Sequence, residues 1–447
     1  MATVKSKEKL LEEKDEKLRE KIERKHGKSV EQLYEEREKR YRDAVELREP
    51  DRVPVCVEMD WIPGGRVQTQ ERFLDAGAWW EAGKRTIVDF EPDIYVYLLG
   101  QTSGAALETL APTGYKWPGG GVGQNAMPQV IETEPMKAAE YDMFLFDPGD
   151  WTLRYYLPRV WKAMAPLSKL PPLQSLWGST GLATQSARFG SPEVIKAFEA
   201  LFKAGQEQEN FLETDRGAST FEDEMATLGF PPRTHAGGIG FVPFDTLADN
   251  LRQLRGVMLD IYQRPEKLLA ACEKLWEWRL SQGVAPADPK KRGNPKVVSA
   301  GGTHHGGDGF MSKKQYETFF WPFWKRAMLK NIELGFVNHY WGQGYCDSRL
   351  EYFLEIPKGK LIVHVCETDA AKAKDILGGH HCVMGGVPHA LLQVASPQEV
   401  EEYCKKLIKT CGRGGGYVMS TSARLTQEAK PENVKTMVET VKKYGWY

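Results

Sequence analysis

Imidazole side chains gather where the sequence predicts that buried strands end. Five of the nine histidines directly follow or end apolar runs of strand length: His304, His305, His339, His364 and His389. Imidazole changes its protonation near neutral pH, so it suits proton transfer, metal ligation or the binding of an anionic substrate. A single such histidine could be a buried ring bonded to a carbonyl, but their clustering predicts one functional site.

Acidic and aromatic side chains occupy the same kind of position. Carboxylates can move protons, and tryptophans can line an apolar mouth for a flat substrate. The residues of this kind at predicted strand ends, with two polar neighbours, are Glu58, Asp60, Trp61, Trp177, Asp308, Trp341, Gln343, Cys366 and Glu367.

A zinc site is one alternative for these side chains. His364 and Cys366 are alternate residues of one predicted strand, and alternate residues of a strand point the same way. A third and a fourth ligand would come from His339, Glu367, His389 or Cys382. No compact motif such as HExxH or paired CxxC is present, so the sequence leaves a metal open.

Residues 360–388 predict a strand–helix–strand unit that would bring these side chains to one end of a sheet. The apolar run 361–366 predicts a buried strand, Thr368 and Asp369 can cap a helix over 370–377, and a second strand follows at 382–384. A strand, a helix and a strand in this order form a unit whose strands are parallel. Polar groups at the carboxyl ends of parallel strands mark the place where ligands bind.

Apolar runs of the same kind recur along the chain. The other predicted strands cover residues 52–58, 93–99, 172–177, 296–302, 336–341 and 417–420. With the two strands of 360–388 they number eight, each followed by helix, which predicts a (β/α)8 TIM barrel of the α/β class with extra helices. Residues 118–135 predict a surface hairpin or a lid, and residues 190–291 a helical elaboration of the barrel.

Two parts of the chain differ in composition. Residues 1–50 alternate basic and acidic runs with apolar residues at loosely helical spacing, which predicts a charged N-terminal helical arm. The arm would pack on the body or on a second subunit, which leaves a homodimer open. Residues 51–447 would form the barrel.

Composition also excludes several classes of protein. A formal net charge of -1 offers no positive field for nucleic acid. No apolar run reaches membrane-spanning length and the N-terminus is charged, so we expect no membrane contact and a cytoplasmic location. Seven scattered cysteines, an odd number, show no disulfide framework.

Short motifs from about residue 50 to the C-terminus resemble the uroporphyrinogen decarboxylase superfamily. They are Arg52-Val-Pro-Val, Pro92-Asp93, the region of Pro243-Phe-Asp245, Met384-Gly-Gly-Val-Pro388, Ser396-Pro-Gln-Glu-Val and Ala429-Lys-Pro-Glu-Asn433. The resemblance implies a (β/α)8 barrel with one of two chemistries. Decarboxylases of the family need no cofactor and hold a tetrapyrrole's carboxylates with an arginine-rich loop and an aspartate. Corrinoid-dependent methyltransferases use zinc, bound through a His-x-Cys and a distant cysteine, to activate a thiol that takes a methyl group from cobalamin.

Neither family pattern is intact in this chain. After the first predicted strand only Arg66 could replace the arginine-rich loop, and Asp60 would repel the substrate's acid groups. In the methyltransferase register the histidine falls at His339, but Trp341 occupies the cysteine position. The distant cysteine falls near residues 420–423, which hold no thiol, and His364 lies one strand later. The chain therefore resembles a divergent member without the usual zinc-ligand cysteines.

The first hypothesis is an enzyme similar to the corrinoid-linked methyltransferases, which moves a methyl group between a small substrate and a cobalamin carried by a partner protein. Its predicted catalytic residues are His339, His364, Glu367 and Asp60. Its predicted substrate-binding residues are Glu58, Trp61, Arg66, Trp177, His304, His305, Asp308, Trp341, Gln343 and His389. The alternatives are a metal-free decarboxylase or lyase, in which Asp60 or Asp308 moves a proton, and a corrinoid- or porphyrin-binding protein without turnover.

Overall fold

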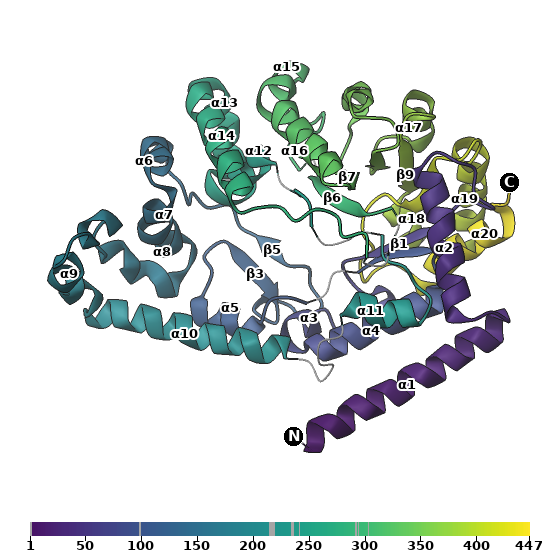
Figure 1. Cartoon of the computed structure of the whole chain (residues 1–447), viewed down its shortest axis with the longest axis horizontal. Helices are drawn as coiled ribbons and strands as arrows, with labels where there is room; N and C mark the ends of the chain where they lie inside the picture. The colour runs from purple at the N-terminus through teal and green to yellow at the C-terminus, as the bar shows by residue number, and fades with distance from the viewer. Residues whose placement is uncertain are drawn as a thin grey trace.

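Parallel strands form the centre of the molecule (Figure 1). A computed structural model describes residues 2–97, 100–213, 220–233, 237–240, 242–290, 293, 295–302 and 304–447, with side chains in all of these ranges except 2–12 and 302. Five strands lie in the order β10-β9-β8-β7-β6, and β1 pairs with β2. The strands are β1 Cys56–Met59, β2 Ile94–Tyr97, β6 Val297–Gly302, β7 Val337–Gly342, β8 Leu361–Val365, β9 Cys382–Val387 and β10 Tyr417–Thr421.

The two sheets adjoin one another at β1 and β10. A parallel bridge joins Val55 to Met419, and another joins Met59 to Leu425. The seven strands therefore follow one another in the order β6-β7-β8-β9-β10-β1-β2, all in one direction. This arrangement shows a mixed α/β fold built on parallel strands.

A further segment occupies the space between β2 and β6. Pro232 forms a parallel bridge with Tyr95 of β2, and the N–H of Arg233 donates to Tyr95 O at 2.9 Å. At the other end, Gly240 approaches β6 so closely that a Cβ there would lie 2.8 Å from Ser299 O. Residues 234–236 and 241 lie outside the described residues, so closure of an eight-membered ring stays a prediction.

The sequence predicted most of these strands correctly. Residues 360–388 form β8, α17 (Ala370–Leu377) and β9, and the side chain of Asp369 caps α17 by accepting from Lys372 N at 2.9 Å. Every residue of β8 is buried, which is why this strand is apolar throughout rather than alternating. Of the predicted strand 93–99, residues 94–97 form β2 and residues 98–99 lie outside the described residues.

The predicted strand over 172–177 is wrong. These residues form a 3₁₀ turn, Leu173–Leu176, in which both the N–H and the Oγ of Ser175 bond to Pro172 O. A strand inside a sheet bonds its backbone to neighbouring strands, whereas Ser175 bonds within its own turn. None of its residues is buried, so its apolar letters do not mark the core.

Helices follow the strands and cover the outer side of the sheet (Figure 1). They include α3 Glu71–Leu74, α4 Ala76–Phe90, α12 Pro243–Thr246, α13 Gln253–Gln263, α14 Pro265–Ser281, α15 Lys313–Gln315, α16 Trp321–Glu333, α18 His389–Val394, α19 Pro397–Cys411 and α20 Pro431–Tyr444. Between β7 and β8 a 3₁₀ segment, Asp347–Glu355, replaces the α-helix. Among the described residues, no helix is both long enough and apolar enough to span a membrane.

The helical elaboration is larger than predicted, because it begins soon after β2. It contains α5 Gly104–Leu110, α6 Tyr141–Phe146, α7 Pro148–Trp151, α8 Leu157–Val160, α9 Gly181–Phe189, α10 Pro192–Leu212 and α11 Phe221–Thr227. The predicted hairpin is present: β3 (Tyr115–Pro118) pairs antiparallel with β5 (Gln129–Val130) and parallel with β4 (Gly121–Val122).

The N-terminal arm consists of two helices, α1 (Ala2–His26) and α2 (Val30–Val45). Ser29 and Gln32 form a reciprocal capping box that starts α2. One face of α2, including Leu33 and Tyr41, is buried against the body near β2 and β10. In Figure 1, α1 runs along the lower edge of the molecule, away from the strands.

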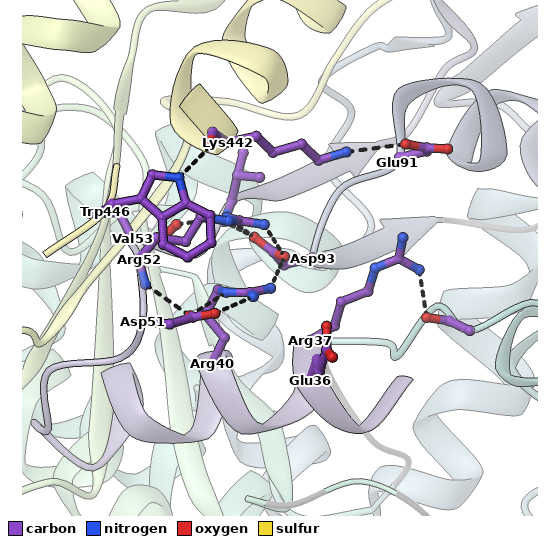
Figure 2. A network of polar contacts seen from close by, with 12 residues as sticks. Glu36, Arg37, Arg40, Asp51, Arg52, Val53, Glu91, Asp93, Lys442 and Trp446 are labelled. Atoms are coloured by element: carbon purple, nitrogen blue, oxygen red, sulfur yellow. Dashed lines mark hydrogen bonds and ion pairs between the residues drawn. The ribbon is translucent and has the colours of Figure 1, made fainter. Parts of the chain in front are cut away.

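A buried ion network joins this arm to the amino ends of the first strands (Figure 2). Asp93 receives two bonds of 2.7 Å from Arg52 and one of 2.6 Å from Arg40 of α2. The N–H of Val55 donates to the same carboxylate at 2.9 Å. Burial by itself would raise the pKa of Asp93, but the charges of Arg52 and Arg40 hold it well below its usual range. One ionised carboxylate therefore fixes β1, β2 and α2 relative to one another.

We expect Asp93→Asn to lower the free energy of unfolding by about 3–5 kcal/mol, because it leaves two buried guanidinium groups short of a counter-charge. Urea unfolding followed by circular dichroism measures the effect. The depressed pKa means that the stability from Asp93 is complete above about pH 5 and is lost only as the pH falls well below the usual range of an aspartate. Asp89→Asn, at an exposed pair with Arg66, is the control and should cost less than about 1 kcal/mol. Equal losses in the two variants would contradict this role.

Candidate active site

A cavity of ≈ 390 Å³ opens at the carboxyl ends of the parallel strands. Its side chains come from β1, β6 and β7, from the loops that follow these strands and β10, and from the segment beside β2. They are Glu58, Asp60, Arg233, Ser299, His304, His339, Trp341, Gln343 and Arg424. Ligands bind at this end of parallel sheets, and a cavity of this volume suits a small molecule.

Three buried side chains that could ligate a metal meet at the base of this cavity. Glu58 of β1, His339 of β7 and His364 of β8 are each at most 1% exposed. One ligand atom from each residue lies within 4.8 Å of the other two. Glu58 Oε1, His339 Nδ1 and His364 Nδ1 have no hydrogen-bond partner among the described residues. Buried polar atoms without partners are rare, and such a set is typical of a site for a proton or a cation.

Arg233 brings a positive charge to this group. Its Nη1 lies 3.3 Å from Glu58 Oε1 and also contacts His339 Nε2. Burial by itself would raise the pKa of Glu58, but Arg233 and His364 lower it well below its usual range. Burial and then Arg233 lower the pKa of His339 well below 6.5. Glu58 is therefore ionised and His339 neutral at pH 7.

The orientation of His364 follows from one backbone contact. Its Nε2 lies 2.7 Å from Thr421 O, and a carbonyl oxygen only accepts, so Nε2 carries a proton. In the neutral ring Nδ1 then bears a lone pair, and it lies 3.2 Å from Glu58 Oε1. Two electron-rich atoms at this distance repel each other unless a proton or a metal cation lies between them.

The rim of the cavity combines opposite charges with an aromatic ring. Arg424 Nη1 lies 3.0 and 3.2 Å from the two carboxylate oxygens of Asp60. The guanidinium carbon of Arg424 also stacks 4.6 Å from the centre of the Trp341 ring. Both members of the ion pair are about a quarter exposed, 26% and 25%, so the pair faces the solvent at the mouth.

The structure brings together about half of the residues that the sequence predicted for the site. Predicted residues that line the cavity or its base are Glu58, Asp60, His304, His339, Trp341, Gln343 and His364. Their roles in binding or catalysis stay predictions. They meet because each lies within or just after a parallel strand, and the carboxyl ends of these strands lie on one side of the sheet.

Two predicted residues next to these lie just outside the cavity. Glu367 is exposed after β8, so the structure brings Glu58, and not Glu367, to His339 and His364. His305 is buried, and its Nδ1 lies 3.2 Å from Asp245 Oδ1.

The other predicted residues lie elsewhere, each held by a contact that the sequence does not reveal. Trp177 is 77% exposed because its predicted strand does not exist. Trp61 packs edge-on to Trp79 in the core, with ring centres 5.9 Å apart. Asp308 accepts from Ser348 Oγ at 2.6 Å, and Arg66 pairs with Asp89 at 2.6 Å. His389 is exposed at the start of α18.

Sequence reasoning missed three residues of the lining: Arg233, Ser299 and Arg424. Arg424 follows β10, so the same rule of strand ends could have found it. Ser299 lies within β6 rather than at its end, so that rule does not reach it. Arg233 lies in a stretch that the sequence predicted as part of a helical elaboration. No local signal marks it, because its position depends on the bridge between Pro232 and β2.

The class of protein that this fold and site define is a parallel-stranded α/β protein with a polar cavity at the carboxyl ends of its strands. Residues 237–444 match the family model for Uroporphyrinogen decarboxylase (URO-D). None of the curated protein sequences matches the chain. Among solved structures, a methyltransferase from Methanosarcina mazei is similar, with a TM-score of 0.51 and 13% identity over 91% of this chain and 98% of that one. At this identity the likeness shows a shared fold. The match over residues 237–444 supports the resemblance to the uroporphyrinogen decarboxylase superfamily that the motifs predicted.

We expect Arg233→Met to lower the free energy of unfolding by about 3–5 kcal/mol, because it leaves the buried Glu58 carboxylate without its main counter-charge. Adding Glu58→Gln should recover part of this loss, since no uncompensated charge remains. Urea unfolding of the single and double variants measures the coupling. Arg424→Met is the control at the exposed pair and should cost less than about 1 kcal/mol. Strictly additive losses would show that Arg233 and Glu58 do not interact.

Proposed function

We propose that this chain is a methyltransferase that moves a methyl group between a small substrate and a corrinoid carried by a partner protein. The observation that carries the proposal is the convergence of Glu58, His339 and His364 at the base of a small cavity. The superfamily match and the fold shared with a methyltransferase support the proposal. A closed (β/α)8 barrel and a cytoplasmic location are parts of the same proposal.

The three donors fit a divalent cation such as zinc. Two histidines and one glutamate are a known ligand set of catalytic zinc, with the fourth position open. A metal ligand must be ionised if it is a carboxylate and neutral if it is imidazole, which agrees with the pKa directions of Glu58 and His339. The positive charge of Arg233 opposes the binding of a metal cation beside it. The proposal of a metal site therefore depends mainly on the atoms of Glu58, His339 and His364 that have no hydrogen-bond partner among the described residues. Bound zinc would supply Lewis acidity at the leaving group.

The rim suits a corrinoid that arrives from outside. A cavity of ≈ 390 Å³ has room for the small substrate, so a corrin would meet it at the mouth. Trp341 offers the rim an aromatic surface for a flat ring, and Arg424 and Asp60 offer donors and acceptors for its amide groups. The corrinoid would supply the cobalt centre that exchanges the methyl group, while these side chains orient it.

We expect the purified protein to bind about one zinc ion per chain, as a site of this ligand set does. Glu58→Gln and His339→Ala should each weaken zinc binding at least about 100-fold, since removing a ligand costs no less than removing its supporting partner. Elemental analysis after dialysis against a chelator series measures this. His380→Gln is the matched control, because His380 bonds to Ile356 O before β9, away from the cavity. Equal zinc in all variants would exclude the ligand set.

The methyl transfer itself is tested with cob(I)alamin and a panel of methylated donors. We expect a change in the corrin absorbance spectrum and a demethylated product by mass spectrometry. His339→Ala should abolish both changes while its circular dichroism spectrum stays that of the parent. Unchanged absorbance and mass with the unaltered protein would refute the proposal.

A second candidate is a metal-free decarboxylase or lyase acting on a small carboxylated substrate. Arg233 and Arg424 favour it, because two guanidinium groups in one cavity suit carboxylate binding. Of the predicted proton carriers, Asp60 lines the cavity, whereas Asp308 is engaged with Ser348 outside it. Release of carbon dioxide from a panel of carboxylic acids would support this candidate. Uroporphyrinogen is not favoured, since Arg66 pairs with Asp89 and the cavity at the strand ends is small for a tetrapyrrole. A bound tetrapyrrole without turnover would show in the visible spectrum.

A further inference from the structure

Two histidines that line the cavity have opposite electrostatic environments. His339 is buried beside Arg233, and its pKa is lowered well below 6.5. The side chain of His304 is 43% exposed, and its pKa is raised, above all by its hydrogen bond to Asp249. When neighbouring groups push two pKa values apart in this way, one group is suited to give a proton and the other to stay neutral. His304 is the group suited to give a proton.

Two aspartates hold His304 in place. Asp245 of α12 accepts from the backbone N–H of His304 at 3.3 Å and from that of His305 at 3.1 Å, which clamps the loop after β6. Asp249, in the π-helical turn Leu247–Leu251, lies 3.1 Å from His304 Nδ1 and orients the ring. The carboxylate only accepts, so Nδ1 carries a proton and Nε2 is the nitrogen left for chemistry. Nε2 has no hydrogen-bond partner within the part of the chain that the structure describes, and His304 lines the cavity.

We propose that His304, oriented by Asp249, is the proton donor of the cavity and protonates the leaving heteroatom of the substrate. This assignment rests on the proposed methyl transfer. As the bond between the methyl carbon and the heteroatom breaks, its electron pair stays on the heteroatom and takes the proton from Nε2. The methyl carbon forms its new bond with the electron pair of the methyl acceptor, the reduced corrinoid of the proposed function. Water then returns a proton to the neutral imidazole.

The proposal specifies a class of substrate. An ether oxygen leaves as a strongly basic alkoxide or phenolate unless an acid protonates it, so a methyl ether needs such a donor. A sulfonium leaves as a neutral thioether and needs none. The cavity combines an oriented acid, His304, with the possible metal ligands at its floor. It therefore suits substrates whose methyl group is bound to a heteroatom that must be protonated when it leaves.

The charged groups around His304 set the pH range of this role. Asp249 and Asp245 favour the imidazolium, while burial and the guanidinium of Arg424 oppose it. The His305 ring lies 6.2 Å from the His304 ring and itself pairs with Asp245. The net effect is a raised pKa, so the donor form is full at low pH and is lost as the pH rises through that pKa.

The first test measures the protein without any substrate. Hydrogen–deuterium exchange at the C2 carbon of histidine, followed by mass spectrometry over a pH series, reports the pKa of each ring. We expect the pKa of His304 to lie above 6.5 and to fall by roughly one unit in Asp249→Asn, because one opposite charge is lost. His380 in the same samples is the control and should not shift. A His304 pKa at or below 6.5, or one that ignores Asp249→Asn, overturns the proposal.

The second test separates proton donation from a structural role. His304→Gln should slow transfer from methyl ethers at least about 100-fold and remove the alkaline limb of the kcat profile. With the trimethylsulfonium ion as donor the loss should be at least about 10-fold smaller. Equal losses on both donors, or wild-type turnover of ethers, would overturn the assignment. If the unaltered protein transfers no methyl group from either donor, the proposed function fails and the role of His304 at the leaving group fails with it. If transfer occurs but the His304 pKa is not raised by Asp249, only the assignment of His304 fails.

Discussion

The buried carboxylate of Asp93 is the interaction on which the remaining structure depends. It lies at the amino end of β2, yet it binds a guanidinium from the arm, a guanidinium from the start of β1 and the backbone of Val55 (Figure 2). A buried charge of this kind is stable only while all of its partners stay in place. The Asp93 carboxylate therefore fixes the register of β1 against β2. This register determines which residues of the two strands reach the cavity at their carboxyl ends.

The carboxyl end of β1 carries a second buried carboxylate with a different kind of environment. Glu58 also has a guanidinium beside it, that of Arg233, but its Oε1 has no hydrogen-bond partner among the described residues. Asp93 is saturated by donors, whereas Glu58 faces two imidazoles that have unpartnered nitrogens of their own. A buried carboxylate whose oxygens are all hydrogen-bonded, such as Asp93, stabilises the fold. A carboxylate in a cavity with an unpartnered oxygen, such as Glu58, can still bind a ligand or a proton.

The chain also differs from the pattern that its resemblance to the uroporphyrinogen decarboxylase superfamily implies. Trp341 stands where the resemblance implies a zinc-ligand cysteine, and its ring stacks with Arg424 at the rim instead of reaching the base of the cavity. The side chains at the base come from the adjacent strands β7 and β8 and from β1, which β9 and β10 separate from β8. A glutamate and two histidines offer harder oxygen and nitrogen atoms than a set of thiolates does.

The sequence alone determined the local elements and the end of the sheet at which chemistry occurs. The apolar run 361–366, the cap at Asp369 and the strand 382–384 each depend on neighbours in the chain, so they could be predicted. The sequence also placed Glu58, His339 and His364 at strand ends. Only the tertiary structure decided that Glu58 rather than Glu367 joins the two histidines, and that Arg233 contacts Glu58 and His339. Such contacts join residues far apart in the chain, and no local pattern encodes which side chains then meet.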